Sequence, residues 1–281
     1  MFSRRFLHVV VLSFVTMALA ISAQAASFSQ ASLKGSYSFS ENKWTTDPGA
    51  HQFGMVGVMR FDGAGNVTGS ATTVANGVSS TGDLGGTYTV NSNGTGVIDI
   101  TTIFLSSGEE QYAITLNSAV GGVAQGFQFI ETLNAVYLVT GTASLLSTTA
   151  RNYSVASVYG TFAIQYNTLT ADPDIYEEGG IGILTLDGKG NIKGSLTDKD
   201  SGGLHTPTLT GTYTVNSDGT CSISLVQPNS ATVKLACALN SVAALGGAKG
   251  LQALVTNPGP SGADNSVNYI VIVTAVKQSV L

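Results

Sequence analysis

The sequence predicts an all-β fold: two tandem eight-stranded antiparallel up-and-down β-barrels that follow a signal peptide. Three observations support this prediction. Blocks of sequence recur 125 residues apart, short segments rich in Val, Ile, Thr, Tyr and Phe alternate with Gly, Asn, Asp and Ser, and no segment has a 3.6-residue apolar period of helix length. The pattern therefore favours many short strands joined by tight turns.

The repeat divides the chain into two copies of one unit. Residues 61–70 (FDGAGNVTGS) match 186–195 (LDGKGNIKGS), and 85–96 matches 210–221 at nine of twelve positions. Solenoid repeats have periods of about 20 to 50 residues, so each copy is predicted to be a domain. We place these domains at 27–148 and 152–281.

Eight strands are expected in the first copy, and short links between them favour antiparallel neighbours. The turns Asp62–Asn66 and Asp187–Asn191 carry the Gly and Asx residues that reversed hairpin turns need. Closure into a barrel would remove the sheet edges, and a two-sheet sandwich is the alternative. The expected strands are 33–40, 52–61, 66–74, 84–91, 95–104, 110–117, 123–131 and 135–144.

Residues 1–25 have the three parts of a secretory signal. Arg4 and Arg5 precede an apolar stretch over 6–21, and Ala23-Gln24-Ala25 provides a small-residue cleavage site. The alternative, an uncleaved anchor, is disfavoured because the apolar run is shorter than the ~20 residues of a spanning helix. We therefore expect a secreted or periplasmic protein that has no membrane segment after cleavage. Its net charge of −5 disfavours a nucleic-acid partner.

The only two cysteines, Cys221 and Cys237, are each eight residues away from Asn229, which lies in the turn-like segment 227–230. In a hairpin they would lie opposite each other, on one apolar face with Ile223 and Leu235. Export makes a disulfide plausible, and a loop of this length would stabilise the fold by about 3 kcal/mol. A redox-active pair is disfavoured because the chain has no C-x-x-C motif.

The sequence contains no recognisable catalytic or metal-binding constellation, so no catalytic residue, metal or cofactor is predicted. His51 and His205 are not equivalent in the two copies, and no G-x-S-x-G or H-E-x-x-H motif is present. The glycine-rich Asp62 and Asp187 segments lack the alternating ligands and closing Glu of a calcium loop. The acidic segment 172–178 is expected to be a solvated loop, with a cation or a basic partner as the alternative.

Two strands carry apolar residues on both faces. Val56 and Val58 lie opposite the predicted inward face of one strand, and Ile181 and Ile183 occupy the same positions in the second copy. We expect the outer valines to meet the sister domain, so that repeat 1 packs on repeat 2. An exposed interaction patch is the alternative.

The blocks Gly35-Ser-Tyr37 and Gly160-Thr-Phe162, the Asp-Gly-x-Gly-Asn turns and the Gly-Thr-Tyr-Thr-Val-Asn segments resemble uncharacterised secreted bacterial tandem-repeat β-barrel proteins. More distantly they look like lipocalin and calycin barrels. That likeness implies a pocket for a small apolar ligand. Tyr37 and Phe162 stand where the lipocalin G-x-W motif has Trp, and Trp44 falls in the expected following loop.

The leading functional hypothesis is a non-enzymatic protein that holds a small apolar molecule in each barrel, under loops at 41–52 and 167–179. The alternative is a structural or adhesive extracellular protein with solid barrels. An enzyme of the barrel-cyclase or hydrolase kind is a third hypothesis. The candidate ligand-binding residues are Trp44, Met55, Met59, Tyr88 and Tyr112 in the first copy, and Leu184, Tyr213, Ile223 and Leu235 in the second.

Overall fold

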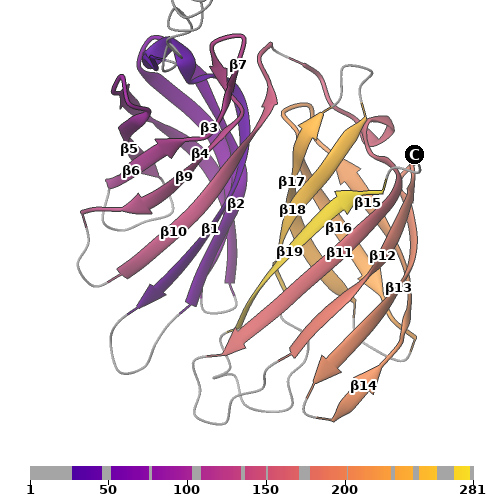
Figure 1. Ribbon diagram of the computed structural model, residues 1–281. Coiled ribbons are helices and arrows are strands. Elements are labelled where there is room, and N and C mark those ends of the chain that lie inside the picture. Colours follow the sequence, from indigo (N-terminus) through magenta and orange to yellow (C-terminus); the bar gives the residue numbers. More distant parts are fainter. Residues whose placement is uncertain are drawn as a thin grey trace, which may run out of the picture.

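The computed structural model describes residues 27–45, 52–75, 78–102, 109–133, 137–149, 151–170, 178–200, 202–228, 232–242, 247–257 and 269–278. The predicted signal peptide, His51 and all but the last residue of the acidic segment 172–178 lie outside these ranges. Within them the chain folds into two barrels, drawn side by side in Figure 1. The described residues contain no helix long and apolar enough to cross a membrane.

Eight antiparallel strands close the first barrel, in the predicted up-and-down order. Neighbours along the chain pair with each other, and the first and last strands complete the cylinder. A short hairpin, β7 (Ala119–Val120) and β8 (Val123–Ala124), is inserted before the seventh barrel strand. The barrel strands are β1 (Lys34–Thr45), β2 (Gln52–Asp62), β3 (Asn66–Ala75), β4 (Val78–Val90), β5 (Thr95–Thr102), β6 (Glu110–Leu116), β9 (Gly126–Glu131) and β10 (Tyr137–Ser147).

The second barrel repeats this topology. Its first strand pairs with both its second and its last, and pairing between the second and third strands closes the cylinder. A short strand, β14 (Gly203–His205), extends the end of β13. The barrel strands are β11 (Tyr159–Thr170), β12 (Glu178–Asp187), β13 (Asn191–Asp200), β15 (Thr208–Val215), β16 (Thr220–Val226), β17 (Val233–Val242), β18 (Ala248–Val255) and β19 (Tyr269–Lys277). The barrel prediction is therefore confirmed over the sandwich.

The repeated Asp-Gly-x-Gly-Asn segments are turns between strands, as predicted. Asp62 Oδ1 accepts hydrogen bonds from the backbone N–H groups of Ala64, at 2.7 Å, and of Asn66, at 3.0 Å. The side-chain amide of Asn66 donates to Asp62 Oδ2 at 2.6 Å, and this bond is the main cause that lowers the pKa of Asp62 to about 2. Gly63 and Gly65 have φ values of 82° and 113°, which glycine adopts without strain. The Asp187 turn has the same hydrogen bonds.

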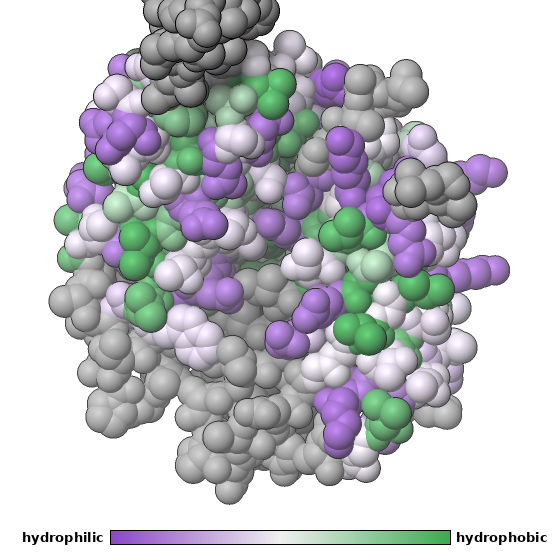
Figure 2. Space-filling model, viewed as in Figure 1, coloured by the Kyte–Doolittle hydropathy of each residue, from purple (hydrophilic) through white to green (hydrophobic). Residues whose placement is uncertain are grey.

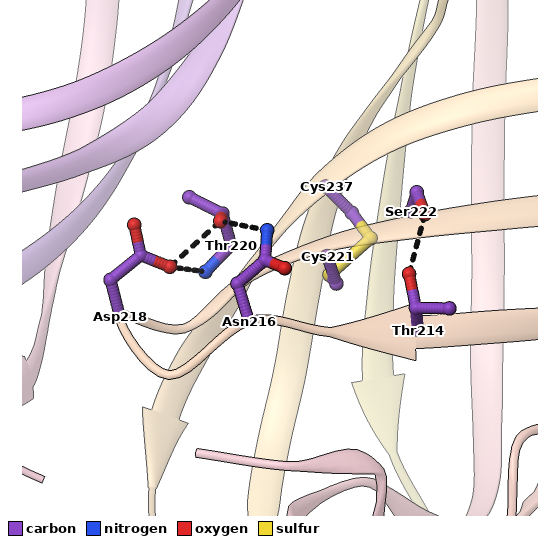
Figure 3. The surroundings of a disulfide bond; sticks show 7 residues. All are labelled: Thr214, Asn216, Asp218, Thr220, Cys221, Ser222 and Cys237. Carbon is purple, nitrogen blue, oxygen red and sulfur yellow. Dashed lines mark hydrogen bonds between the residues drawn. A yellow bond between two sulfur atoms is a disulfide. The ribbon is translucent and has the colours of Figure 1, made fainter. Parts of the chain in front are cut away.

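The hairpin of β16 and β17 has the register predicted from the cysteines. Cys221 lies directly opposite Cys237 and Ile223 lies opposite Leu235. The two cysteines form a disulfide with a Cα–Cα distance of 4.7 Å, just beyond the Asn216–Thr220 turn (Figure 3). The first barrel has Gly96 at the position of Cys221, so the cross-link belongs to the second copy alone.

The barrels contact each other through their outer surfaces. The outward side chains of Val56 and Val58 are each 2% exposed, and they belong to the same apolar cluster as Ala238 and Leu254 of the second barrel. Ser70 Oγ donates a hydrogen bond to Asp218 Oδ2 across this contact, at 2.8 Å. The interface therefore combines close-packed aliphatic side chains with a polar bond.

Ile181 and Ile183, at the repeat positions of Val56 and Val58, are 62% and 42% exposed. The expectation that Trp44 lies in a loop is wrong, because β1 continues to Thr45 and Trp44 pairs with Leu138 and Gln52. The polar residues of 41–45 had suggested a loop, but the strand continues because its inward polar side chains find partners inside the barrel.

Candidate functional site inside the first barrel

A buried cluster of charged side chains occupies one end of the first barrel. Along β1 the side chains of Tyr37, Phe39, Glu41 and Lys43 alternate inward, and their exposures are 0%, 0%, 4% and 7%. The first two belong to the apolar core, so the next two extend the inward face into a polar region. Charged residues are seldom this buried unless they are paired, so Glu41 and Lys43 are expected to have partners inside the barrel.

The partners come from two strands across the barrel. Glu110 begins β6, Glu131 ends β9, and both carboxylate side chains are 3% exposed. Lys43 Nζ lies 3.1 Å from Glu110 Oε1 and 3.9 Å from Glu131 Oε2. The same ammonium lies 4.3 Å from the centroid of the Tyr137 ring, which adds a cation–π contact. The ammonium of Lys43 therefore lies close to two carboxylate groups.

Tyr112 links the third carboxyl group, Glu41, to this pair. Its phenol oxygen lies 3.0 Å from Glu41 Oε2 and also contacts Glu110 Oε2 at short range. A phenol has one proton, so it can donate to only one of these acceptors. Both contacts are hydrogen bonds if Glu41 is protonated and donates to Tyr112, which in turn donates to Glu110. The group then forms a chain from Glu41 through Tyr112 and Glu110 to Lys43.

Burial favours this protonation. It raises the pKa of Glu41 from 4.5 to about 8. Repulsion from Glu110 also raises this pKa, whereas the hydrogen bond with Tyr112 lowers it. Burial also raises the pKa of Glu131, although Lys43 opposes it. The pKa of Tyr112 lies well above 10, because burial and the two adjacent carboxyl groups disfavour a phenolate. At neutral pH Glu41 therefore retains a proton that an exposed carboxylate would release.

One atom of the cluster has no hydrogen bond. Glu131 Oε2 is buried and accepts none from any described residue, and Lys43 Nζ at 3.9 Å is beyond hydrogen-bond distance. A buried carboxylate oxygen without a donor is unfavourable by roughly 1–3 kcal/mol or more. Among the described residues, no group of three or more His, Cys, Asp or Glu side chains is arranged to hold a metal ion.

The rest of the first barrel's interior is filled by packed rings. Phe61 makes edge-to-face contacts with Tyr37, Tyr88 and Phe127, at centroid distances of 5.5, 5.1 and 5.7 Å. The Tyr88 hydroxyl donates to the backbone oxygen of Leu33 at 2.8 Å. These side chains close the barrel at the end opposite the charged cluster.

The candidate ligand-binding residues of the first copy divide between this core and the outer surface. Met55, Met59, Tyr88 and Tyr112 are at most 6% exposed and belong to one core cluster. Of these, Tyr112 has hydrogen bonds with the charged groups, and Met55 lies directly opposite Glu41 in the pairing of β1 with β2. Trp44 is half-buried and follows the inward Lys43, so it lies on the outer side of β1.

Among its described residues, the second barrel has no cluster of three carboxyl groups and a lysine. It has one buried carboxylate, Asp198, which accepts a hydrogen bond from the Tyr166 hydroxyl. Pairing with equivalent strands places Val233, Leu235 and Val255 where the first barrel has Glu110, Tyr112 and Glu131. Tyr166 and Thr168 replace Glu41 and Lys43, 125 residues on. The other candidate residues of this copy, Leu184, Tyr213 and Ile223, are at most 5% exposed in the second core. The two barrels thus share a fold and differ in their interiors.

Sequence reasoning missed the cluster because its members are single residues on separate strands. A signal was present: Glu41 follows the inward Phe39 by two positions, Glu110 precedes Tyr112 by two, and Glu131 follows Phe129 by two. Alternation carried to the strand ends would have put all three carboxyl groups inside.

No protein-family model matches the chain, and no curated protein matches it. Among solved structures, a protein of unknown function from the DUF3598 family of Nostoc punctiforme is 13% identical, covers 89% of this chain and 98% of its own, and has a TM-score of 0.28. Kievitone hydratase from Nectria haematococca is 8% identical (92% and 93% covered, TM-score 0.24). A putative AttH protein from Nitrosomonas europaea is 7% identical (86% and 92% covered, TM-score 0.22). At these TM-scores none of the likenesses bears on the activity of this chain.

Proposed function

We propose that the protein is an exported, non-enzymatic binding protein whose first barrel takes a small amphiphilic molecule at its charged end. The ligand would present an ammonium or another strong hydrogen-bond donor to Glu131 and an apolar body to the neighbouring rings. The observation that carries this proposal is the buried Glu131 Oε2, which accepts no hydrogen bond from the part of the chain that the structure describes.

The charge balance of the cluster supports a donating, cationic head group. Three carboxyl groups face a single ammonium, and Glu41 is neutral at pH 7 because its pKa is about 8. Glu110 and Glu131 therefore share the single ammonium of Lys43, and Glu131 is the more distant of the two from it. A ligand cation at Glu131 would supply both a closer positive charge and the missing hydrogen bond.

Aromatic side chains next to the cluster support the apolar part of the ligand. Tyr137 and Phe53 are half-buried, and their rings meet edge to face at 6.1 Å. Rings beside a carboxylate suit organic ammonium ions, because the ring face and the carboxylate both attract the cation. The Lys43 ammonium already occupies such a position over Tyr137.

Export is supported by the predicted signal peptide and by the Cys221–Cys237 bridge, since disulfides form and persist in oxidising compartments. We accordingly place the protein in the periplasm or outside the cell.

Titration calorimetry and native mass spectrometry with octylamine test the ligand class, with octanol and octanoate as probes of matched chain length. We expect one octylamine per chain, and weaker binding of the other two. Glu131→Gln removes a charge-assisted hydrogen bond, which corresponds to a loss of affinity of about tenfold or more. Glu109→Gln, at an exposed position, is the matched control. Absence of stoichiometric binding, or binding unaffected by Glu131→Gln, would contradict the proposal.

A second candidate function is structural or adhesive, with no ligand. The close ring packing around Phe61 favours it, because the described apolar interior of the first barrel is occupied by the protein's own side chains. Failure of all three probes to bind would favour this candidate.

A further inference from the structure

The contact between the barrels uses a different outer surface of each repeat. The first barrel contributes outward residues of β10, β1 and β2, which we call face A. The second contributes outward residues of β17, β18 and β19, which we call face B. Because the two barrels are copies of one unit, each has both faces. One face A and one face B are paired within the chain, and one of each is left over. The two faces of a barrel share one strand, which is β10 in the first barrel and β19 in the second.

The unused face A lies on the second barrel, on β19, β11 and β12. Ile181 and Ile183 occupy the repeat positions of the buried Val56 and Val58, 125 residues on, and Val276 beside them is 58% exposed. Figure 2 shows hydrophobic side chains at the surface in this part of the second barrel. These residues are apolar, as the residues of an interface are, but they face solvent.

The unused face B lies on the first barrel, on β6, β9 and β10. In the second barrel, face B has Gln252 opposite Ala238 and Leu254 opposite Ala236. The matching pairs of the first barrel are Gln128 opposite Thr115 and Ile130 opposite Ala113. Ala238 and Leu254 are 0% and 1% exposed, whereas Ile130 is 43% exposed.

This free face is also concave. A groove of about 490 Å³ is lined by the four residues just paired and by their neighbours on β1 and β10, Ser40, Asn42, Thr140 and Thr142 among them. Its place on the repeat corresponds to the surface of the second barrel that receives Val56 and Val58. The groove therefore has the position needed to receive an aliphatic ridge, with Ala113 and Ile130 as apolar contacts within a largely polar lining.

The polar bond of the internal interface has a counterpart as well. Ser70 donates to Asp218, and 125 residues separate Ser70 from Ser195 and Asn93 from Asp218. Ser195 and Asn93 are both exposed. Asn93 Oδ1 already accepts two hydrogen bonds from Thr95, so here the bond would run in the opposite direction, from the Asn93 amide N–H to the serine hydroxyl oxygen. The second pair of faces therefore keeps a polar partner at this position.

We infer that a second copy of this chain docks the free face A of its second barrel onto the free face B of the first barrel. The contact repeats the internal one, with Ile181 and Ile183 in the place of Val56 and Val58. It is a head-to-tail contact, so every added copy presents another pair of free faces and the chains grow into oligomers. This inference is independent of the proposed ligand.

Sedimentation velocity over a series of protein concentrations tests the assembly. The unmodified mature protein is expected to shift from one chain to dimers and larger species as concentration rises. The double variant Ile181→Lys/Ile183→Lys is expected to remain a single chain throughout. Leu204→Lys is the matched control, because Leu204 is 68% exposed but lies on β14, outside face A, and should assemble like the parent. A single chain at every concentration would overturn the inference.

Cysteine cross-linking tests the orientation. When Ser195→Cys and Asn93→Cys chains are mixed and oxidised, a head-to-tail contact joins one chain of each kind into a dimer. Neither variant should cross-link efficiently alone. A chain carrying both substitutions should give a ladder of oligomers, with the Cys221–Cys237 bridge verified by mass spectrometry. Cross-links that join Ser195→Cys to itself would indicate a face-to-face dimer and overturn the inference.

Discussion

Glu41 Oε2 lies 3.0 Å from the phenol oxygen of Tyr112, inside the first barrel. The phenol also contacts Glu110, so a carboxylic acid, a phenol, a carboxylate and the Lys43 ammonium follow one another. This arrangement depends on the proton of Glu41. Loss of that proton should lower the stability of the protein.

Stability is expected to fall as pH rises from about 5 to 8. The native pKa of Glu41 is about 8, raised mainly by burial from a usual value of 4.5, so the native state binds a proton that the unfolded state has released. The stabilisation is complete below the unfolded pKa and is lost as pH passes the folded one. One proton corresponds to a slope of about 1.4 kcal/mol per pH unit in the free energy of unfolding. Urea unfolding at several pH values measures it, and Glu41→Gln should flatten the profile. Parallel profiles for the two proteins would contradict the protonated state.

Lys43→Met is expected to destabilise the protein by about 3–5 kcal/mol, because it leaves Glu110 charged and buried without its cation. The double variant Lys43→Met/Glu110→Gln removes both charges and should recover part of this loss. Chemical denaturation of the three proteins in one buffer provides the comparison. A double variant no more stable than Lys43→Met would mean that the pair is not coupled.

Replacing both cysteines with alanine should lower the free energy of unfolding by about 3 kcal/mol, as expected for a bridge that closes a short loop. The parent protein in reductant should approach the stability of the variant, whereas reductant should leave the variant unchanged. Denaturation curves with and without reductant separate the cross-link from the packing of the two side chains.

Val58→Ala and Ile183→Ala form a matched pair at one repeat position. Val58 is 2% exposed at the barrel contact, so its truncation should cost about 2 kcal/mol. Ile183 is 42% exposed, and its truncation should change the stability of the isolated chain by no more than about 0.5 kcal/mol. Thermal unfolding at low protein concentration measures both. Equal losses would indicate that Ile183 is also covered in the single chain.

Local patterns in the sequence were enough to predict the barrels and the cysteine register. The 125-residue offset marked two units, and the spacing of Cys221 and Cys237 about their turn fixed which residues face each other. Such features depend on neighbours along the chain, where turn chemistry and alternation act directly.

Features that depend on distant strands were harder to predict. Glu110 and Glu131 meet Lys43 only after closure of the barrel, and alternation along each strand can place them inside without showing which side chains they contact. Val58 and Ile183 have similar side chains, but Val58 is buried and Ile183 is exposed, because only Val58 lies at the contact between the barrels. Trp44 was misplaced because the polar end of β1 has the composition of a loop.

The aliphatic residues Val233, Leu235 and Val255 stand at the positions of Glu110, Tyr112 and Glu131. Aliphatic side chains need no ionic partner, so this end of the second barrel is stabilised by packing where the first barrel depends on paired charges. One strand framework therefore accommodates two chemically different interiors.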